Sequence, residues 1–426
     1  MDSREDDKKR QKNRRQFLAT AGTLVAGGGV VAALAGGCGG KKDGGDKIRI
    51  VSSLPRTGSA RGQTDTIVNG IQMAIDEFGG KVAGLTIEYS DMDDATAAAG
   101  QWAPEAEKAN AQKAAADPDV MAMIGPYNSG AAMVSMLELN DAGLVQVSPA
   151  CTWPGLTKKI DGVAPDEPEK YRPAKRVTFT RVCPTDDVQG PLAAEFAKDE
   201  LKVKTVYIID DKELYGQGVA KLFRKRAEEI GIKVLGQESI NVTSNEFGAL
   251  MTRIKGLNPD LLYFGGTTQT KGGQIAKDLR KSGPNCPMMA PDGCFENAFI
   301  ESAGADVLEG KCYVTIGGTD LELLGEPGKK FLNKYMEKYK KEPEAYAVYG
   351  YEAALVVLEA IKKVGKKDRE EILKAVLATK DFDKGVLGKW SFDANGDTTL
   401  QQLKISRVEG GKFKTVKVID KKPGKA

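Results

Sequence analysis

Residues 120–153 of this 426-residue chain read VMAMIGPYNSGAAMVSMLELNDAGLVQVSPACTW. Residues 120–124 and 144–147 are short apolar runs bounded by turn residues, a pattern typical of buried strands. Between them, apolar residues at positions 132–137 recur at helical spacing and stop before Gly143. The stretch therefore predicts a strand, a helix and a second strand, which is the repeating unit of a parallel sheet.

The same alternation continues on both sides of this unit. Helical spacing recurs at residues 67–78, before Gly79, and at residues 219–230, before Gly231. The other predicted strands are residues 48–52, 85–89, 177–182, 205–209, 261–264 and 313–316. Alternation of this length predicts an α/β protein with parallel sheets covered by helices on both faces, arranged as Rossmann-like lobes.

Two segments have a different character. Residues 161–175 are rich in proline and charge, so we expect a surface insertion or a boundary between lobes. Residues 386–392, 400–408 and 413–419 predict a hairpin-like β tail. Between them, residues 393–397 predict an Asn-Gly turn with Asx capping rather than a calcium loop, because no Glu follows at the twelfth position.

The composition excludes several classes of function. The chain has no histidine, which removes Ser-His-Asp, Cys-His and His-ligated metal mechanisms. Asp91, Asp93 and Asp94 follow a predicted strand, where we expect a solvated loop rather than a metal site. Seven of the 62 Lys/Arg and four of the 59 Asp/Glu lie in residues 1–37, so the rest of the chain is formally neutral and nucleic acid is not an expected partner. We therefore expect a binding protein without metal or cofactor, and not an enzyme.

Residues 1–37 have the features of an export signal. Arg14 and Arg15, followed by Phe-Leu, resemble a twin-arginine (Tat) signal, and several glycines leave the next stretch too weakly apolar for a permanent transmembrane helix. Leu34-Ala35-Gly36-Gly37-Cys38 resembles a lipobox, which predicts lipidation of Cys38 and a flexible tether over residues 38–46. Cleavage after Ala35, as in an ordinary secreted protein, stays open. We expect export by the Tat machinery to the periplasm or cell envelope, with a lipid anchor as the only membrane attachment.

Five cysteines follow Cys38, an odd number, so at least one is free or paired with another molecule. Cys286 and Cys294 are the only closely spaced pair. For them, a disulfide and two buried thiols both stay open.

Polar residues gather where the predicted strands end. In open parallel sheets, ligands bind at the carboxyl ends of strands, where helix N-termini offer unpaired N–H groups. Here those positions are residues 125–130, 148–153, 210–216, 265–268 and 291–293. The first half of the chain supplies hydroxyls, and the second half supplies a carboxylate and a phenol.

These strand ends resemble those of the leucine/isoleucine/valine-binding family of ABC-transporter substrate-binding proteins, which have the type I periplasmic-binding fold. The resemblance runs from about Lys47 to the C-terminus. It rests on Ile124-Gly125, residues 147–150, 185–191, 209–220 and 263–266, and Pro291-Asp292-Gly293, in that order and spacing. It implies two lobes joined by a hinge of three crossings. Lobe 1 would be residues 47–182 and 317–393, and lobe 2 residues 183–316 and 394–426.

The resemblance also implies a function. The chain would be an extracytoplasmic monomer that binds an amino acid, of the branched-chain type or related to it, by hinge closure. It would deliver this ligand to the membrane permease subunits of an ABC importer. A sensor for amides, urea or aromatic acids and a secreted cofactor-dependent α/β enzyme are the alternatives.

Carried over residue by residue, the family's α-carboxylate site falls on Ser129 and Thr152, and its ammonium site on Asp292 and the carbonyl of Ala150. Tyr215 would close over the ligand from lobe 2. The chemistry agrees, because a carboxylate binds N–H and O–H donors and an ammonium binds a carboxylate and carbonyls. Taken singly, Ser129 is typical of a helix N-cap, Thr152 of a turn and Tyr215 of packing.

Other residues are expected near the ligand side chain. They are Arg61, Tyr127, Cys151, Trp153, Thr267, Tyr346 and Ala347. An inward-pointing Arg61 would disfavour a purely aliphatic pocket. Asp94 and Asn128 stand in the regions where the compared family members have a cysteine pair, so that disulfide is absent.

Overall fold

The computed structural model describes residues 47–421. The export signal at residues 1–37 with Arg14 and Arg15, the tether at residues 38–46 with Cys38, and residues 422–426 lie outside the described residues. Between residues 47 and 421, no helix is both long enough and apolar enough to cross a membrane.

The first sheet has six strands in the order β2-β3-β1-β4-β5-β6. All neighbours are parallel except β2, which pairs antiparallel with β3. The strands are β1 (Lys47–Leu54), β2 (Lys81–Val82), β3 (Leu85–Asp93), β4 (Val120–Ile124), β5 (Val145–Ser148) and β6 (Phe179–Arg181). Helices α2 (Arg61–Glu77), α3 (Pro104–Ala116) and α4 (Ser129–Asp141) connect them, and α3 packs against α4.

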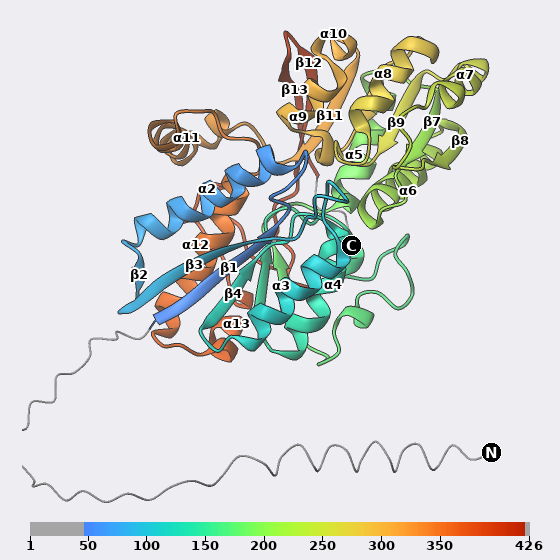
Figure 1. The fold of residues 1–426 in the computed structure, drawn as a ribbon. Helices are drawn as coiled ribbons and strands as arrows, with labels where there is room; N and C mark the ends of the chain where they lie inside the picture. The colour runs from blue at the N-terminus through green and yellow to red at the C-terminus, as the bar shows by residue number, and fades with distance from the viewer. Residues whose placement is uncertain (1–46, 422–426) are drawn as a thin grey trace, which may run out of the picture. The chain divides into compact units, whose positions relative to one another are not determined.

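Three helices follow β11 (Cys312–Gly317) in the chain, and two of them pack on the first sheet and its helices. They are α11 (Gly325–Tyr339), α12 (Ala347–Val364) and α13 (Arg369–Leu377), and α13 packs on β4 and β5. Helix α12 lies along α2 (Figure 1). The backbones are so close that a Cβ on Gly70 would lie 2.1 Å from the carbonyl oxygen of Ala347, and one on Gly350 would lie 2.5 Å from that of Ile67. Glycine at both positions therefore allows the close α2–α12 packing.

The second sheet has seven strands in the order β13-β12-β11-β10-β9-β7-β8. The first five along the chain are parallel, whereas β12 and β13 form an antiparallel hairpin at one edge. The strands are β7 (Thr205–Asp210), β8 (Lys233–Ser239), β9 (Leu261–Gly265), β10 (Met288–Ala290), β11 (Cys312–Gly317), β12 (Gln402–Glu409) and β13 (Lys412–Asp420). The helices are α5 (Asp186–Asp199), α6 (Leu214–Glu229), α7 (Gly248–Leu257), α8 (Gly272–Ser282), α9 (Asn297–Ala303) and α10 (Ala305–Leu308).

These two mostly parallel sheets with flanking helices confirm the predicted fold class. The chain passes from β6 to the second sheet, from β11 to the helices on the first sheet, and back at β12. Residues 161–175 lie in the connection between β5 and β6 and contain the 3-10 helix η2 (Glu169–Tyr171), so they are an insertion within the first half rather than a boundary.

The strand predictions need correction in two respects. Residues 386–392 do not form a strand, because the backbone N–H of Val386 and the indole N–H of Trp390 donate to the Glu352 carboxylate at 2.9 and 2.7 Å. This stretch has isolated bridges only. Conversely, β2, β8 and β10 were not predicted.

The turn at residues 393–397 is the predicted Asx-capped turn. Asp393 Oδ1 accepts from the backbone N–H of Asn395 at 2.8 Å and of Asp397 at 2.9 Å. The turn also brings Asp397 to Arg181 at the end of β6, where their ion pair of 2.7 Å is fully buried. This Arg181–Asp397 pair ties the first crossing between the sheets to the third.

The burial of Asp94 and of the cysteines decides two other expectations. Asp94 is not solvated: it is 0% exposed, and neither of its carboxylate oxygens has a hydrogen-bond partner within the described residues. Burial also raises the pKa of its neighbour Glu107 to about 8. The five cysteines between residues 47 and 421, including Cys286 and Cys294, are buried free thiols.

Candidate ligand-binding site

Asp292 is the centre of a hydrogen-bond cluster that joins the two sheets. It opens the 3-10 turn η3 (Asp292–Cys294) directly after β10, so it lies at the carboxyl end of the second sheet. Its Oδ1 accepts from the Tyr215 hydroxyl at 2.7 Å and from Gln189 Nε2 at 2.5 Å. Its Oδ2 accepts from the hydroxyl of Tyr346 at 2.5 Å. Tyr346 precedes α12, which packs on α2 of the first sheet, so the Asp292 carboxylate is held from both sides.

The Asp292 carboxyl is buried without a charge partner. Burial raises its pKa, although the hydrogen bonds from Tyr346, Tyr215 and Gln189 oppose that rise. Between residues 47 and 421, no lysine or arginine forms an ion pair with it. A carboxylate has about four acceptor positions, and three are used here. A buried, unneutralised carboxylate with acceptor capacity left is suited to a cationic group of a ligand.

Asp186 and Gln189, on the first turns of α5, link Asp292 to the end of β5. The Asp186 N–H donates to the carbonyl of Thr152 at 3.0 Å, and Asp186 Oδ1 accepts from Gln189 Nε2 at 3.0 Å. Gln189 Oε1 in turn accepts from the Asp292 N–H at 3.1 Å. Burial and the nearby Asp292 charge raise the pKa of Asp186 well above its ordinary value.

Sequence reasoning did not assign a role to Asp186 or Gln189. Both lie in the stretch 185–191 that contributed to the family resemblance. Locally, however, Asp186 is typical of the acidic first turn of a helix and Gln189 of an ordinary helical glutamine, so only that resemblance could have drawn attention to them.

The end of the first sheet supplies donors. Ser129 is the first residue of α4, so its N–H group and those that follow it have no acceptor within the helix. Its Oγ accepts from the Trp153 N–H at 3.2 Å, which leaves its own hydroxyl proton free to donate. Thr152 Oγ1 is buried without a hydrogen-bond partner in residues 47–421. N–H and hydroxyl donors at a helix N-terminus, such as those of Ser129, are suited to an anionic group.

The remaining predicted residues are distributed around this cluster. The Tyr127 ring meets Tyr346 edge to face, with 5.8 Å between ring centroids. Trp153 packs on α6, where a Cβ on Gly218 would lie 2.3 Å from the indole. Ala150 and Ala347 are buried beside the cluster elements.

Three of the predicted residues have other contacts. Cys151 is buried, with its Sγ 3.2 Å from the carbonyl of Pro126. The Thr267 hydroxyl is hydrogen-bonded to that of Thr270 at 3.1 Å, within its own turn. Arg61 is not brought to the cluster, because its side chain is 69% exposed at the start of α2 and lies 3.7 Å from Asp65.

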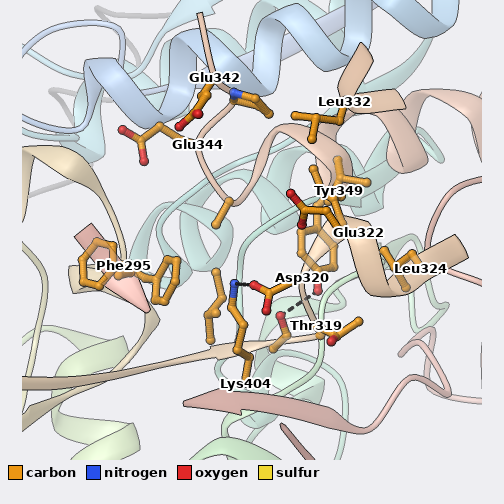
Figure 2. Close-up of a pocket in the computed structure, with 18 of the residues that line it drawn as sticks. Phe295, Thr319, Asp320, Glu322, Leu324, Leu332, Glu342, Glu344, Tyr349 and Lys404 are labelled. Atoms are coloured by element: carbon orange, nitrogen blue, oxygen red, sulfur yellow. Dashed lines mark hydrogen bonds and ion pairs between the residues drawn. The ribbon is translucent and has the colours of Figure 1, made fainter. Parts of the chain in front are cut away.

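Little space separates the residues of the cluster. A cavity of about 10 Å³, roughly one water molecule, borders Thr152, Gln189 and Tyr346. A much larger cavity, of about 440 Å³, lies between the end of β11, α11 and the start of β12 (Figure 2).

None of the predicted ligand residues lines this larger cavity. Its Lys404 and Asp320 pair with each other at 2.9 Å (Figure 2). It has no buried polar atom without a partner among the described residues. We therefore take the Asp292 cluster as the candidate site.

Comparisons with known proteins agree with the observed fold. The sequence profile of the family described as periplasmic binding protein matches residues 47–412. The chain is 28% identical over 369 residues to the Leu/Ile/Val-binding protein BraC3 of Rhizobium johnstonii, covering 86% of this chain and 93% of that one. The leucine-binding protein LivK of Thermotoga maritima superposes with a TM-score of 0.77 at 27% identity, over 88% of this chain and 99% of that one. LivJ of Streptococcus pneumoniae, in complex with isoleucine, gives 0.76 at 25% identity, over 89% and 100%.

Proposed function

The chain belongs to the periplasmic binding protein family, within the branched-chain amino acid substrate-binding proteins of ABC transporters, and from this premise we propose that it binds an α-amino acid between its two sheets. The members and the fold are those of solute-binding proteins and not of enzymes. Delivery of the bound amino acid to membrane permease subunits follows as part of the proposal.

The observation that carries the proposal is the buried Asp292 carboxylate, which Tyr346 holds from the first sheet and which Gln189 and Asp186 link to the loop after β5. The ligand ammonium binds Asp292 and the carbonyl of Ala150. The ligand carboxylate binds the hydroxyls of Ser129 and Thr152 and the N–H groups that open α4. An amino acid has both charges on one carbon, so one ligand satisfies both ends of the site.

We further propose that the two sheets belong to two lobes that close on the ligand. Lobe 1 is residues 47–182 and 317–393, and lobe 2 is residues 183–316 and 394–426. The cluster supports this, because a cavity of about 10 Å³ is too small for an amino acid unless contacts such as Tyr346–Asp292 separate first. Hinge closure of this kind is the general mechanism of periplasmic binding proteins.

A thermal-shift screen tests the proposal. The panel is the twenty amino acids, small amides and aromatic acids, applied to the protein without its residues 1–37. A ligand at a hundredfold excess over its Kd stabilises the folded state by about 2.7 kcal/mol, which raises the Tm measurably. At least one α-amino acid is expected to do so. If only amides or aromatic acids raise the Tm, the ligand class is wrong.

The proposal includes the cellular location. We propose that Arg14 and Arg15 direct export by the Tat machinery and that a lipid on Cys38 anchors a monomer at the envelope membrane. An extracytoplasmic location agrees with the family, since a periplasmic binding protein receives its ligand outside the cytoplasm.

A further inference from the structure

Glu296 is a second buried carboxylate beside the candidate site, and no ion pair in residues 47–421 accounts for it. It follows η3 and precedes α9, and it is 1% exposed. Neither of its carboxylate oxygens has a hydrogen-bond partner among residues 47–421. An acid this deeply buried is normally paired or hydrogen-bonded, so an unpaired one points to a ligand group.

Capping of α9 does not explain it. Glu296 has the N-cap position, but its side chain makes no capping hydrogen bond. The first N–H of the helix, that of Asn297, instead donates to the carboxylate of Glu344 at 3.2 and 3.3 Å. Glu344, labelled in Figure 2, therefore caps the helix, and the Glu296 carboxylate makes no capping hydrogen bond.

The neighbours of Glu296 come from both lobes. The carbonyl of Phe295, next to it in the chain, accepts from Gln63 of α2 at 3.1 Å, and Gln63 also holds the backbone N–H of Tyr346 at 3.1 Å. Burial, then the charges of Glu296 and Asp292, raise the pKa of Tyr127 well above its ordinary value, so the Tyr127 phenol lies near both acids. Glu296 thus lies on the Tyr127 side of the cluster, where the ligand side chain is expected.

The charged groups around Glu296 are acidic. Burial raises its pKa to about 8, the nearby Thr268 hydroxyl opposes this rise, and the charge of Glu344 adds to it. Within residues 47–421 no lysine or arginine pairs with Glu296, just as none pairs with Asp292. An amino acid with an aliphatic side chain has a single cationic group, its α-ammonium. It can therefore neutralise Asp292 or Glu296, but not both.

We propose that Glu296 binds a cationic nitrogen on the ligand side chain, so that the preferred ligand is a basic amino acid. The proposal rests on the proposed function and deepens it: Asp292 takes the α-ammonium, and Glu296 takes the side-chain ammonium or guanidinium. Glu296 is then a specificity residue of this chain.

Titration calorimetry with L-lysine, L-arginine and L-leucine tests the assignment. The wild-type protein is expected to bind lysine or arginine at least tenfold more tightly than leucine. Glu296→Gln keeps the shape and removes the charge, so it should weaken binding of that basic amino acid at least thirtyfold and change binding of leucine less than threefold. The control is Glu301→Gln on the exposed face of α9, with all affinities near wild type.

The outcomes separate the two proposals. If leucine binds at least as tightly as the basic amino acids, or if Glu296→Gln weakens leucine and lysine equally, this inference is wrong while the proposed function stands. If no amino acid binds, the proposed function itself fails.

A second measurement does not depend on the ligand. The folded-state pKa of Glu296, about 8, is above the ordinary value of 4.5, so the folded protein retains a proton that the unfolded chain releases. Stability of the ligand-free protein therefore falls as pH rises from about 4.5 to 8, and Glu296→Gln should remove part of that fall. Glu344 and Asp292, whose pKa values are also raised, titrate in both proteins, whereas Tyr127, whose pKa lies well above 10, stays neutral in this range. Parallel stability profiles would show that Glu296 is not buried as described, and would overturn the assignment.

Discussion

Tyr346 donates its hydroxyl to Oδ2 of Asp292 at 2.5 Å, although one residue precedes a helix on the first sheet and the other follows a strand of the second. This hydrogen bond joins the two sides of the proposed ligand site. Because the acceptor is also the proposed ammonium partner, binding of a ligand and contact between the sheets depend on the same carboxylate.

Asp292→Asn should nearly abolish binding. It removes the charge that pairs with the ligand ammonium while keeping the shape, and stranding one member of a buried ion pair typically costs about 3–5 kcal/mol. That is a few hundredfold to several thousandfold in Kd, measured by titration calorimetry with the best ligand of the screen. Asp278→Asn is the control, because Asp278 is a buried carboxyl that accepts from the Phe247 N–H at 2.7 Å. A change below about threefold for Asp292→Asn would leave the ammonium site unassigned.

Binding should weaken as the pH falls. The pKa values of Asp292 and of the coupled Asp186 are raised, and only the ionised carboxylate attracts an ammonium. Below the raised pKa, the ligand must displace a proton, which costs about tenfold in Kd per pH unit. Titration calorimetry in buffers with different ionisation enthalpies measures how many protons the protein releases when the ligand binds. Proton uptake on binding, or a Kd that does not rise as the pH falls, would contradict the assignment.

Gly218→Ala should weaken ligand binding more than folding. The added Cβ would lie 2.3 Å from the Trp153 indole, at a contact between α6 and the loop after β5. Overpacking there costs about 1–3 kcal/mol, and the cost falls on the form in which the two lobes touch. We expect Kd to rise about tenfold while the Tm without ligand holds, since alanine favours the helix. Gly256→Ala on α7, with open space around it, is the control; equal effects of the two would disprove the contact.

Asp397→Asn should destabilise the fold itself. It strands the buried Arg181 guanidinium at the crossings, a loss of about 3–5 kcal/mol in urea unfolding. Burial alone raises the pKa of Asp397, but the charges of Arg181 and Lys158 hold it below its ordinary value. The pair therefore stabilises the protein above the unfolded-state pKa of about 3.9, and this stability is lost as pH falls through the lower folded-state pKa. The control is Asp381→Asn at an exposed ion pair, where a change below about 1 kcal/mol is expected. Similar urea midpoints for the two variants would refute the prediction.

The N-terminal proposals are tested by cell fractionation. Arg14→Lys with Arg15→Lys should abolish export, because Tat recognition depends on the arginine pair. Cys38→Ala should release the exported protein from membranes, whereas Cys312→Ala, in β11, should not. Unchanged export or persistent anchoring would contradict the corresponding proposal.

The alternating elements could be predicted because their signals are local. Strands such as β4 and β9 are apolar runs that end at glycine or proline, and the helices end where glycine allows the turn. Strand β10 gave no such signal: it is only three residues long, without a β-branched side chain. Residues 386–392 resemble a strand in sequence but do not form one. The backbone N–H of Val386 donates to the distant Glu352 carboxylate and not to a neighbouring strand.

The site was less predictable than the fold. Family resemblance identified Asp292 and Tyr215, which the structure joins by a hydrogen bond of 2.7 Å. Gln189 lies 103 residues from Asp292 in the chain, and nothing in its local pattern distinguishes it from other helical glutamines. Arg61 shows the converse, because its position in the sequence suggested the pocket while the first turn of α2 points it into solvent. Such relationships arise from packing between sheets, which short patterns do not encode.

The close packing of α12 on α2 has a consequence for the entropy of binding. Gly70 and Gly350 let the two backbones touch, and Tyr346 stands at the start of the helix that they lock in place. The tyrosine is therefore ordered when lobe 1 folds, long before a ligand arrives. Because the Tyr346 side chain is already ordered, binding does not incur the entropy cost of fixing its rotamer, and the free energy of binding is more favourable by that amount. In the proposed closure of the lobes, Tyr346 therefore adds no ordering cost of its own.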